Sequence, residues 1–404
     1  MLPGRAATDL PALVSRYADR FHAAVGDDHH VASPLGAWLL LALVGPLAEG
    51  PDRRAIEDVL GCPVAPARAA VDALLASPDP AVGAALAGWA DLAEVGAAVA
   101  AWLEALPTGT DRGPVPTQDE ADRWAREHTF GLIERFPLGL QPDTLLVLAS
   151  ALATRVGWQQ PFQLRPASEL GGSFTTSVDH ILHTAARHET WLADTAGGRV
   201  VVVEKLAEGL VVRSVLGPRG ATAAAVLDAA HELSRTPGRP AQVSLFDVAL
   251  GDGDHGTITE RTYASTGTSD RVETAEAWLP AWEAESDHEL MRDERLGFTT
   301  AGAVLVRTMP DRAEGFAVEA RQSAMARSTR LGFEAAAVTA MAVRAGAAMP
   351  REVTVTERHL AARFDRPFAV VAATVGGFGP DGPSPWTGLP VFSAWVTDAI
   401  EPPD

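Results

Sequence analysis

The sequence predicts an α+β protein. Its first 160 residues have mostly helical patterns, and short β-rich runs follow from about Gly172 onward. Helical and strand segments that lie apart along the chain, rather than alternating, are typical of α+β folds. With 404 residues, of which 47% are hydrophobic and 21% are charged, the chain can bury a large core. No repeat or low-complexity linker divides it, so we expect one domain that spans residues 1–404.

Apolar residues recur every three or four positions in the N-terminal part, which predicts helices at 10–25, 38–47 and 67–75. Strands are predicted where β-branched residues run together or alternate with polar ones. These segments are 143–149, 200–204, 209–216, 242–250 and 272–280. Further helices are expected at 223–233 and 287–296, and a surface loop rich in Pro, Gly and Thr at 106–118.

The charge balance excludes some partners. Lys and Arg total 33 against 52 Asp and Glu, and the resulting net charge of −19 repels phosphate backbones and anionic lipid. We therefore expect no nucleic-acid or membrane partner. No segment approaches the ~18 apolar residues of a membrane span, and the N-terminus lacks a signal-peptide pattern, so a cytoplasmic monomer is expected. Heavy use of Ala, Gly, Pro and Arg is typical of GC-rich bacterial genomes.

No cofactor or metal is expected. The only cysteine is Cys62, so neither an intrachain disulfide nor a cysteine metal cluster can form. His180, His183 and His188 are spaced for a zinc site only if the segment is helical, but it has a loop and strand pattern, and His29-His30 is expected in a turn. We expect all of these histidines to be solvated.

An acidic segment, Gly251-Asp-Gly-Asp254, resembles the magnesium-binding loop of dihydroxyacetone-kinase-type phosphotransferases. Strands are predicted on both sides of it, and Asp-Gly steps are typical of hairpins. We therefore expect a turn rather than a metal site. No nucleophile elbow, Walker loop or dinucleotide-binding glycine pattern supports a hydrolase or a nucleotide-dependent enzyme.

The alanine-rich segment 332–340 is the most informative stretch of the chain. Its small side chains suit a strand that has to enter between two existing strands, because they force little overpacking. Alanine is also the best helix former, so the segment on its own is equally consistent with a plain helix. The residues concerned are Gly332, Phe333, Glu334, Ala335, Ala336, Ala337, Val338, Thr339 and Ala340.

Together with seven other segments in the same order, this segment resembles the serpins, the serine protease inhibitor superfamily. The resemblance covers nearly the whole chain. The matching motifs are Ser33-Pro34-Leu35, Ile56 to Gly61, Trp124 to Ile133, Leu146 to Phe162, Ala275 to Glu283, and the two closing segments Phe364 to Val371 and Leu389 to Pro402.

The resemblance implies a large central mixed β-sheet, smaller sheets and eight or nine helices. It also implies an inhibitor, not an enzyme. In that family a serine protease cleaves an exposed reactive-centre loop, here about residues 330–360, and is trapped covalently while the hinge inserts into the sheet. Counting from Gly332 places the reactive-centre bond at Gly346-Ala347, which suits an elastase-like or subtilisin-like protease, whereas Arg344 would suit a trypsin-like one.

The hinge departs from the family pattern at three positions. Arg330 and Leu331 replace an acidic pair, and Phe333 replaces a small hydroxyl residue. A phenyl ring entering the sheet is expected to overpack it at a cost of ~1–3 kcal/mol, so Phe333→Thr should improve insertion. Between Gly332 and Phe364 there are 32 residues, about ten more than expected, and we place the extra ones at 356–363.

The centre beneath the sheet, known in the family as the shutter, departs as well. Beside the retained Ser33, this chain has Gly36, Ser150 and Gln322 where the family commonly has serine, asparagine and histidine. We expect Gln322 and Ser150 to share a hydrogen bond. These departures favour an alternative, a non-inhibitory protein of the same fold that serves as a binding protein, a recruited scaffold or an enzyme.

Overall fold

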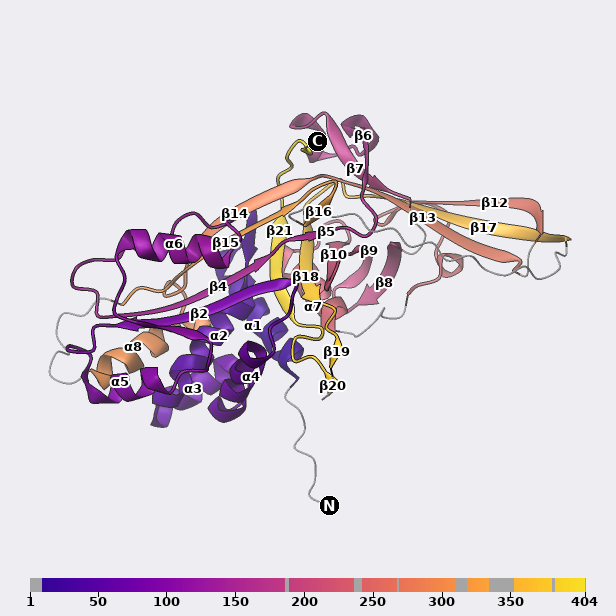
Figure 1. The fold of residues 1–404 in the computed structure, drawn as a ribbon. Coiled ribbons are helices and arrows are strands. Elements are labelled where there is room, and N and C mark those ends of the chain that lie inside the picture. The colour runs from indigo at the N-terminus through magenta and orange to yellow at the C-terminus, as the bar shows by residue number, and fades with distance from the viewer. Residues whose placement is uncertain are drawn as a thin grey trace, which may run out of the picture.

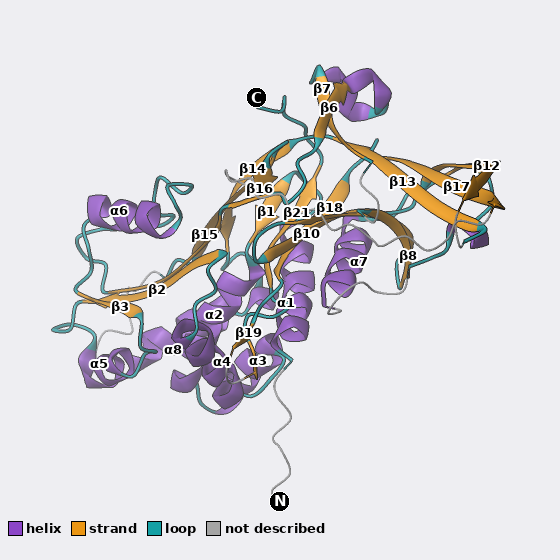
Figure 2. Cartoon of the chain, turned by 45° about the vertical axis from the view of Figure 1, so that its right-hand side comes forward, coloured by secondary structure: helices purple, strands orange, loops and turns teal. Residues whose placement is uncertain are grey.

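The computed structural model describes residues 9–185, 189–235, 242–266, 269–309, 318–333, 352–379 and 382–403. These residues form an α+β fold of eight α-helices and several β-sheets, with most helices gathered on one side of the sheets (Figure 1, Figure 2). The helices are α1 (Leu10–Val25), α2 (Pro34–Val44), α3 (Gly50–Leu60), α4 (Val64–Ala76), α5 (Gly96–Glu104), α6 (Gln118–His128), α7 (Ala223–Arg235) and α8 (Phe298–Thr308). The α+β prediction is confirmed.

The central helix α2 packs against α1, α4, α8 and the strand β4 (Leu146–Thr154). All of its residues except Leu40 are buried, which matches its uniformly apolar sequence. Helix α1 is amphipathic, and its N-cap Asp9 accepts a hydrogen bond of 3.2 Å from the backbone of Ala12. No single described helix is long and apolar enough to cross a membrane, although the bent pair α3 and α4 passes that test together.

A large central sheet is built from two groups of strands. One group has the order β14 (Trp282–Glu289), β15 (Arg321–Ser328), β16 (Gly332–Phe333) and β5 (Val156–Gly157). The other has the order β3 (Thr110–Gly113), β2 (Val82–Ala90) and β4. Only Arg155 separates β4 from β5, so the two groups are continuous along the chain. Helix α6 packs on β2 and β4 through a separate apolar cluster.

A second sheet is antiparallel throughout. Its strand order is β1 (His30–Ala32), β21 (Pro390–Val396), β18 (Phe368–Thr374), β10 (Leu210–Leu216), β9 (Gly198–Leu206) and β8 (Thr190–Thr195). Every residue of β18 and β21 is buried. Such strands need apolar residues on both faces, because helix α7 covers one side while the main core lies on the other.

The third sheet carries a projection from the body of the molecule. Its order is β11 (Gly251–Gly253), β12 (Gly256–Thr266), β17 (Glu352–Arg363), β13 (Arg271–Leu279), β7 (His180–Thr184) and β6 (Gln163–Pro166). Strands β12, β13 and β17 extend away from the body as a three-stranded arm (Figure 1). A short hairpin, β19 (Phe378–Gly379) and β20 (Gly382–Pro383), completes the strands.

Three predicted elements are wrong. Segment 242–250 contains the 3₁₀ turn η4 (Leu245–Asp247), because the Ser244 hydroxyl caps it by accepting from the backbone of Phe246. Segment 287–296 ends strand β14 and forms η5 (Glu294–Leu296) instead of a helix, since pairing with β15 outweighs local helix propensity. The expected loop 106–118 contains β3, which is held by β2. The remaining 3₁₀ turns are η1 (Gly45–Leu47), η2 (Ala167–Glu169) and η3 (Ser173–Thr176).

Candidate strand-acceptor site

The central sheet is split between β4 and β15. Strand β15 pairs with β14 from Arg321 to Ser328, and β4 pairs with β2 along its whole length. Across the split, the described residues are joined only by β16, where Phe333 opposes Ser328 on one side and Val156 on the other. Beyond β16, toward Arg321 of β15 and Leu146 of β4, the facing edges of these two described strands are unpaired. We call this split the acceptor seam, because unpaired edges are templates for an added strand.

Phe333 closes the upper end of the acceptor seam. Its side chain is only 3% exposed, and its ring centroid lies 6.3 Å from that of Trp158 and 6.2 Å from that of Trp282. The predicted overpacking by Phe333 is therefore wrong, since the ring fills a space lined by two indoles. Gly332 and Phe333, the first two residues of the alanine-rich segment, thus already lie within the sheet.

The turn before Phe333 is fixed by backbone contacts. Leu331 accepts a hydrogen bond of 2.9 Å from the Trp158 backbone, and Thr329 accepts one of 3.0 Å from the indole Nε1 of Trp158. The carbonyl of Arg330 accepts a third, of 3.0 Å, from the backbone of Phe162. Arg330 thus holds the turn through its main chain, a contact that any residue at this position would provide.

The chain's single lysine, Lys205, is linked to this turn through Phe162. Its ammonium group lies 4.5 Å from the centre of the Phe162 ring and 2.7 Å from Glu189, and the side chain is almost completely buried. Burial lowers the pKa of Lys205, whereas Glu189 opposes that shift. Sequence reasoning missed this residue, although a lone lysine in an arginine-rich chain was a signal that could have drawn attention to it.

The four predicted shutter residues lie together beneath the acceptor seam and line one cavity of about 40 Å³. The amide of Gln322 is engaged on both sides by Ser33: its Oε1 accepts from the Ser33 backbone N–H at 2.9 Å, and its Nε2 donates to the Ser33 carbonyl at 2.8 Å. The expected bond between Gln322 and Ser150 is absent from the described hydrogen bonds. A Cβ at Gly36 would lie 3.0 Å from Ser150 Oγ, so glycine permits the close approach of α2 to β4.

The lower end of the acceptor seam opens into a cavity of about 1070 Å³ between α2, α8, β4 and β15. Its lining combines apolar side chains, including Leu40, Leu148, Phe298 and Leu305, with polar ones such as Asp91, Glu319 and Arg321. A cavity of this size and composition is of the kind that receives a small ligand.

Four buried histidines lie together where α1, β1, α7 and β14 meet. The expectation that His30 is solvated is wrong, and it is also wrong for His183, which is 3% exposed. His30 Nδ1 donates to the Asp28 carbonyl at 2.8 Å, so its Nε2 accepts from His22 Nδ1, also at 2.8 Å. The Nε2 of His22 then accepts from Ser393 Oγ at 2.7 Å. His288 Nε2 donates to the carbonyl of Val31 at 2.7 Å. The imidazole of the fourth, His231, is fully buried and has no hydrogen-bond partner among the described residues.

These contacts hold the histidines neutral. Burial is the main cause in each case, and it brings the pKa of His30 down to about 4 and that of His231 to about 3. Burial and the neighbouring imidazoles hold the pKa of His22 well below its usual range. Burial also lowers the pKa of His288, against the hydrogen bond to Val31.

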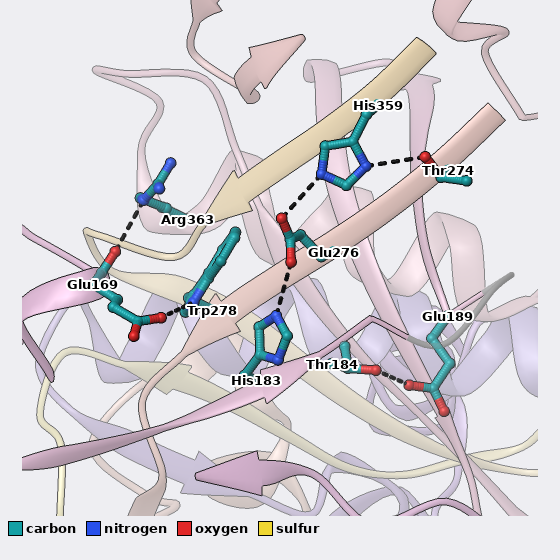
Figure 3. Close-up of polar contacts among 9 residues, drawn as sticks. All are labelled: Glu169, His183, Thr184, Glu189, Thr274, Glu276, Trp278, His359 and Arg363. Carbon is teal, nitrogen blue, oxygen red and sulfur yellow. Dashed lines mark hydrogen bonds and ion pairs between the residues drawn. The ribbon is translucent and has the colours of Figure 1, made fainter. Parts of the chain in front are cut away.

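A second polar cluster lies at the root of the arm (Figure 3). His183 and His359 each place Nε2 at 3.0 Å from a different oxygen of Glu276, so the carboxylate of β13 joins β7 to β17. Burial favours the neutral acid, but the two histidine hydrogen bonds hold the pKa of Glu276 below its usual value. His359 Nδ1 also contacts Thr274 Oγ1 at 3.0 Å.

The histidine and aspartate motifs do not form metal sites in the described structure. His180 bonds to Glu401 at 2.6 Å while His183 bonds to Glu276, because residues three apart on a strand point to opposite faces. His188 lies outside the described residues. Among the residues that the structure describes, no group of three metal-binding side chains occurs. The expected turn at Asp254 is confirmed, since it joins β11 to β12 as a hairpin.

The extra residues of the predicted loop lie in a strand. Residues 356–363 belong to β17, where all of them pair with β13 and residues 356–361 also pair with β12. The segment that remains between β16 and β17, residues 334–351, lies outside the described residues. It contains the predicted hinge residues Glu334, Ala335, Ala336, Ala337, Val338 and Thr339, Arg344 and the bond Gly346-Ala347, whose roles stay predictions.

Solved structures with this arrangement of strands are serpins. Serpin48 of the insect Tenebrio molitor has 16% identity and a TM-score of 0.62, with 98% of this chain and all of that chain covered. Native tengpin, a thermophilic serpin, has 12% identity and a TM-score of 0.64 over 98% of this chain and 95% of its own. Human thyroxine-binding globulin has 14% identity and a TM-score of 0.62 over 98% and 100%. No family model and no curated protein sequence matches the chain.

The chain therefore has the fold of the serpin superfamily, as its motifs predict. At these identities the likeness defines the architecture, and the activity has to be argued from this chain's own residues.

Proposed function

We propose that this protein traps serine proteases by the serpin route: the protease cleaves the loop, remains attached as an acyl-enzyme, and is carried along as the freed hinge enters the acceptor seam. One observation supports this most directly. Phe333 is already paired on both sides at the upper end of a seam whose lower edges are unpaired in the described residues. The seam thus has the place and the starting register for an added strand.

The register of Phe333 predicts where the following residues enter. Its antiparallel continuation places Ala335 between Ala326 and Thr154, both of which are buried. Strand side chains alternate, so Ala335 would face the core with Phe333 while Ala336 would face outward. The free edge of β15 down to Arg321 accommodates residues 334–340. The small side chains of this segment therefore fall where little space remains.

Insertion has a favourable free energy for a physical reason. Each backbone hydrogen bond formed along the two edges contributes about 0.5–1.5 kcal/mol net, and an inserted strand forms such bonds on both sides. The intact loop is tied at both ends, to β16 and to β17, and cleavage removes one tie. Cleavage therefore stabilises the protein, which is the source of the trapping force.

A second candidate is a binding protein that uses the same fold. The cavity of about 1070 Å³ at the lower end of the acceptor seam favours it, and a thyroxine-binding globulin of similar architecture was solved as a complex with thyroxine. In this case the loop has no protease to trap, and a small molecule with both apolar and polar groups would occupy the cavity.

The two candidates differ in what a protease does to the loop. The protein is incubated with trypsin, elastase and subtilisin, and the products are separated under denaturing conditions. We expect a covalent complex with at least one of them and a higher melting temperature for the nicked protein. The same protease with its catalytic serine blocked is the matched control, since it cannot form an acyl bond. Nicking that yields neither a complex nor stabilisation would favour the binding protein.

A further inference from the structure

The cavity of about 1070 Å³ lies at the end of the molecule opposite the arm, where α5 and α8 lie side by side (Figure 1). Pockets that bury drug-sized ligands have volumes of about 300–1,000 Å³, so this cavity reaches the upper limit of that range. Protein interiors are otherwise close-packed, with few spaces larger than a water molecule. A space of this size between core elements is therefore a candidate binding site, and its walls define what it would bind.

The inner wall of the cavity is apolar and incompletely covered. Helix α2 is buried at every residue except Leu40, and Leu40 lines this cavity. Leu305 and Val306 of α8 are half-buried and line it as well. On β4, Leu146 and Leu148 are half-buried in the lining, whereas the residues that alternate with them are buried in the cluster under α6. Three core elements thus leave large apolar side chains uncovered around one space, which an apolar ligand group would fill.

The polar part of the lining is predominantly acidic. Among the described residues it has four carboxylates and one guanidinium, namely Asp91, Glu94, Asp143 and Glu319 against Arg321. The guanidinium Nε of Arg321 lies 3.7 Å from Glu319, so these two charges offset each other. Glu94 already has an interaction within the protein. Asp91 and Asp143 are therefore the carboxylates that are open to a ligand.

Backbone pairing brings Asp91 and Asp143 to the same end of β2 and β4. Ala90 lies opposite Leu146 in this antiparallel pair, and the backbone N–H of Asp91 donates to the Leu145 carbonyl at 2.9 Å. Asp143 comes two residues before Leu145, so it lies at the same end of the strand pair. Both aspartates are exposed, whereas the leucines of the apolar wall are half-buried. The carboxylates therefore lie at the rim of the cavity and the apolar wall lies inside it.

An apolar interior with an anionic rim complements one class of small molecule. An ammonium group donates up to three hydrogen bonds, and those to carboxylates are charge-assisted. An anionic head group would be repelled by the rim and by the net charge of −19 on the chain. An uncharged head group would gain the apolar contacts without the electrostatic attraction.

We propose that this cavity binds an amphiphile with a cationic, ammonium-type head group. Its apolar part lies against Leu40, Leu148 and Leu305, and its head group lies at Asp91 and Asp143. The inference deepens the second candidate function and rests on it for the use of the cavity. It requires no cleavage of the loop, so it is independent of protease trapping.

The test compares three probes that share one alkyl chain and differ in head-group charge: octylamine, octanol and octanoate. Their binding to the full chain is measured by isothermal titration calorimetry at about pH 7.5. We expect octylamine to bind about tenfold more tightly than octanol, and octanoate to bind more weakly than octanol. Added salt should narrow these differences, because the rim carboxylates are exposed.

Substitutions locate the two parts of the ligand. Asp91→Asn and Asp143→Asn should each weaken octylamine binding about threefold and leave octanol binding unchanged, and the double variant should bind octylamine no better than octanol. Glu285→Gln is the matched control, because it removes the same charge from an exposed position outside the cavity lining. Leu305→Gln should weaken octylamine and octanol by the same factor, since both probes share the alkyl chain.

The outcomes separate the possible failures. Equal affinities for octylamine and octanol, tighter binding of octanoate, or an equal loss in Glu285→Gln and Asp143→Asn would overturn the cationic class of ligand. In each of these cases, octanol binding that is weakened in Leu305→Gln would still support the second candidate function. If none of the three probes binds, the inference and the second candidate function fail together, and protease trapping is still decided by its own covalent complex.

Discussion

Phe333 packs edge-on against Trp282, with ring centroids 6.2 Å apart and ring planes at 62°. Trp282 begins β14, two strands away from the short β16 that carries Phe333. The contact therefore crosses β15 and ties the entering segment to the far side of the sheet. An aromatic residue at this point acts as an anchor for the hinge, in a space that a small hydroxyl residue would leave partly empty.

Truncation of Phe333 should destabilise the protein. Phe333→Ala removes a buried ring between two indoles, and such changes typically cost about 3–5 kcal/mol. Phe333→Thr should also destabilise the folded protein, whereas the sequence alone predicts only that this substitution improves insertion. Urea unfolding measures the difference, with Leu331→Ala as the control because Leu331 is 39% exposed. A stability of Phe333→Thr equal to or above wild type would show that the ring is not an anchor.

Loss of the Gln322 amide should weaken the joint beneath the acceptor seam. Gln322→Met keeps the length of the side chain but leaves the N–H of Ser33 without its partner, at a cost of about 1–3 kcal/mol for that buried group. The Ser33 carbonyl keeps only the longer bond of 3.4 Å from the backbone of Ala37. Chemical denaturation provides the measurement. Ser323→Thr, at the neighbouring position on the outer face of β15, keeps the hydroxyl that donates to Asp287 and should change stability by less than about 0.5 kcal/mol. Equal effects of the two substitutions would contradict the role assigned to Gln322.

The fold was predictable because it depends on patterns that extend over many residues. Helix α1 begins and ends where its apolar periodicity does, and β13 lies within one residue of its predicted bounds. The wrong elements are short, and distant residues decide them. Segment 287–296 looks helical by composition, yet His288 pairs with Gln322, which is 34 residues later in the chain. Pattern reasoning has no access to such a partner.

The site was predictable in position but not in contacts. The resemblance to serpins brought together Ser33, Gly36, Ser150 and Gln322, which line one cavity. The expected Gln322–Ser150 bond failed because the Ser33 backbone uses both ends of the amide. The histidine pair of His22 and His30 gave no sequence signal at all, since their contact depends on how α1 meets β1.

The stability of the protein should fall in mild acid. The pKa values of His22, His30, His231 and His288 are all lowered in the folded state, so below the ordinary value of about 6.5 the unfolded chain binds protons that the native state excludes. Folded stability is thus present above about pH 6.5 and is lost as the pH falls toward about 4. Burial and the neighbouring Asp228 raise the pKa of Asp19 to about 7, which increases folded stability as the pH falls. This is one group against the four histidines, so we expect the net stability to decrease.

His231→Phe isolates one part of this effect. Both ring nitrogens of His231 lack partners among the described residues, so phenylalanine removes a proton site without breaking a hydrogen bond. The variant should match wild type at pH 7.5 and exceed it at pH 5, with a slope of stability against pH reduced by up to about 1.4 kcal/mol per unit. His180→Gln is the control, because His180 is exposed. Parallel pH profiles for wild type and His231→Phe would contradict the assignment.

The insertion register gives the sharpest test of the acceptor seam. Ala335 should enter between the buried residues Ala326 and Thr154, so Ala335→Arg would place a charge in the core at a cost of several kcal/mol. Ala336 should face outward beside Met325, which is only partly buried, so Ala336→Arg adds the same charge at little cost.

After the loop is nicked, we expect the melting temperature of Ala336→Arg to rise as that of wild type does, and the melting temperature of Ala335→Arg to stay unchanged. The covalent complex should likewise survive in the first and be lost in the second. The reverse pattern would mean that the strand enters one residue out of register, and equal behaviour would mean that it does not enter the acceptor seam.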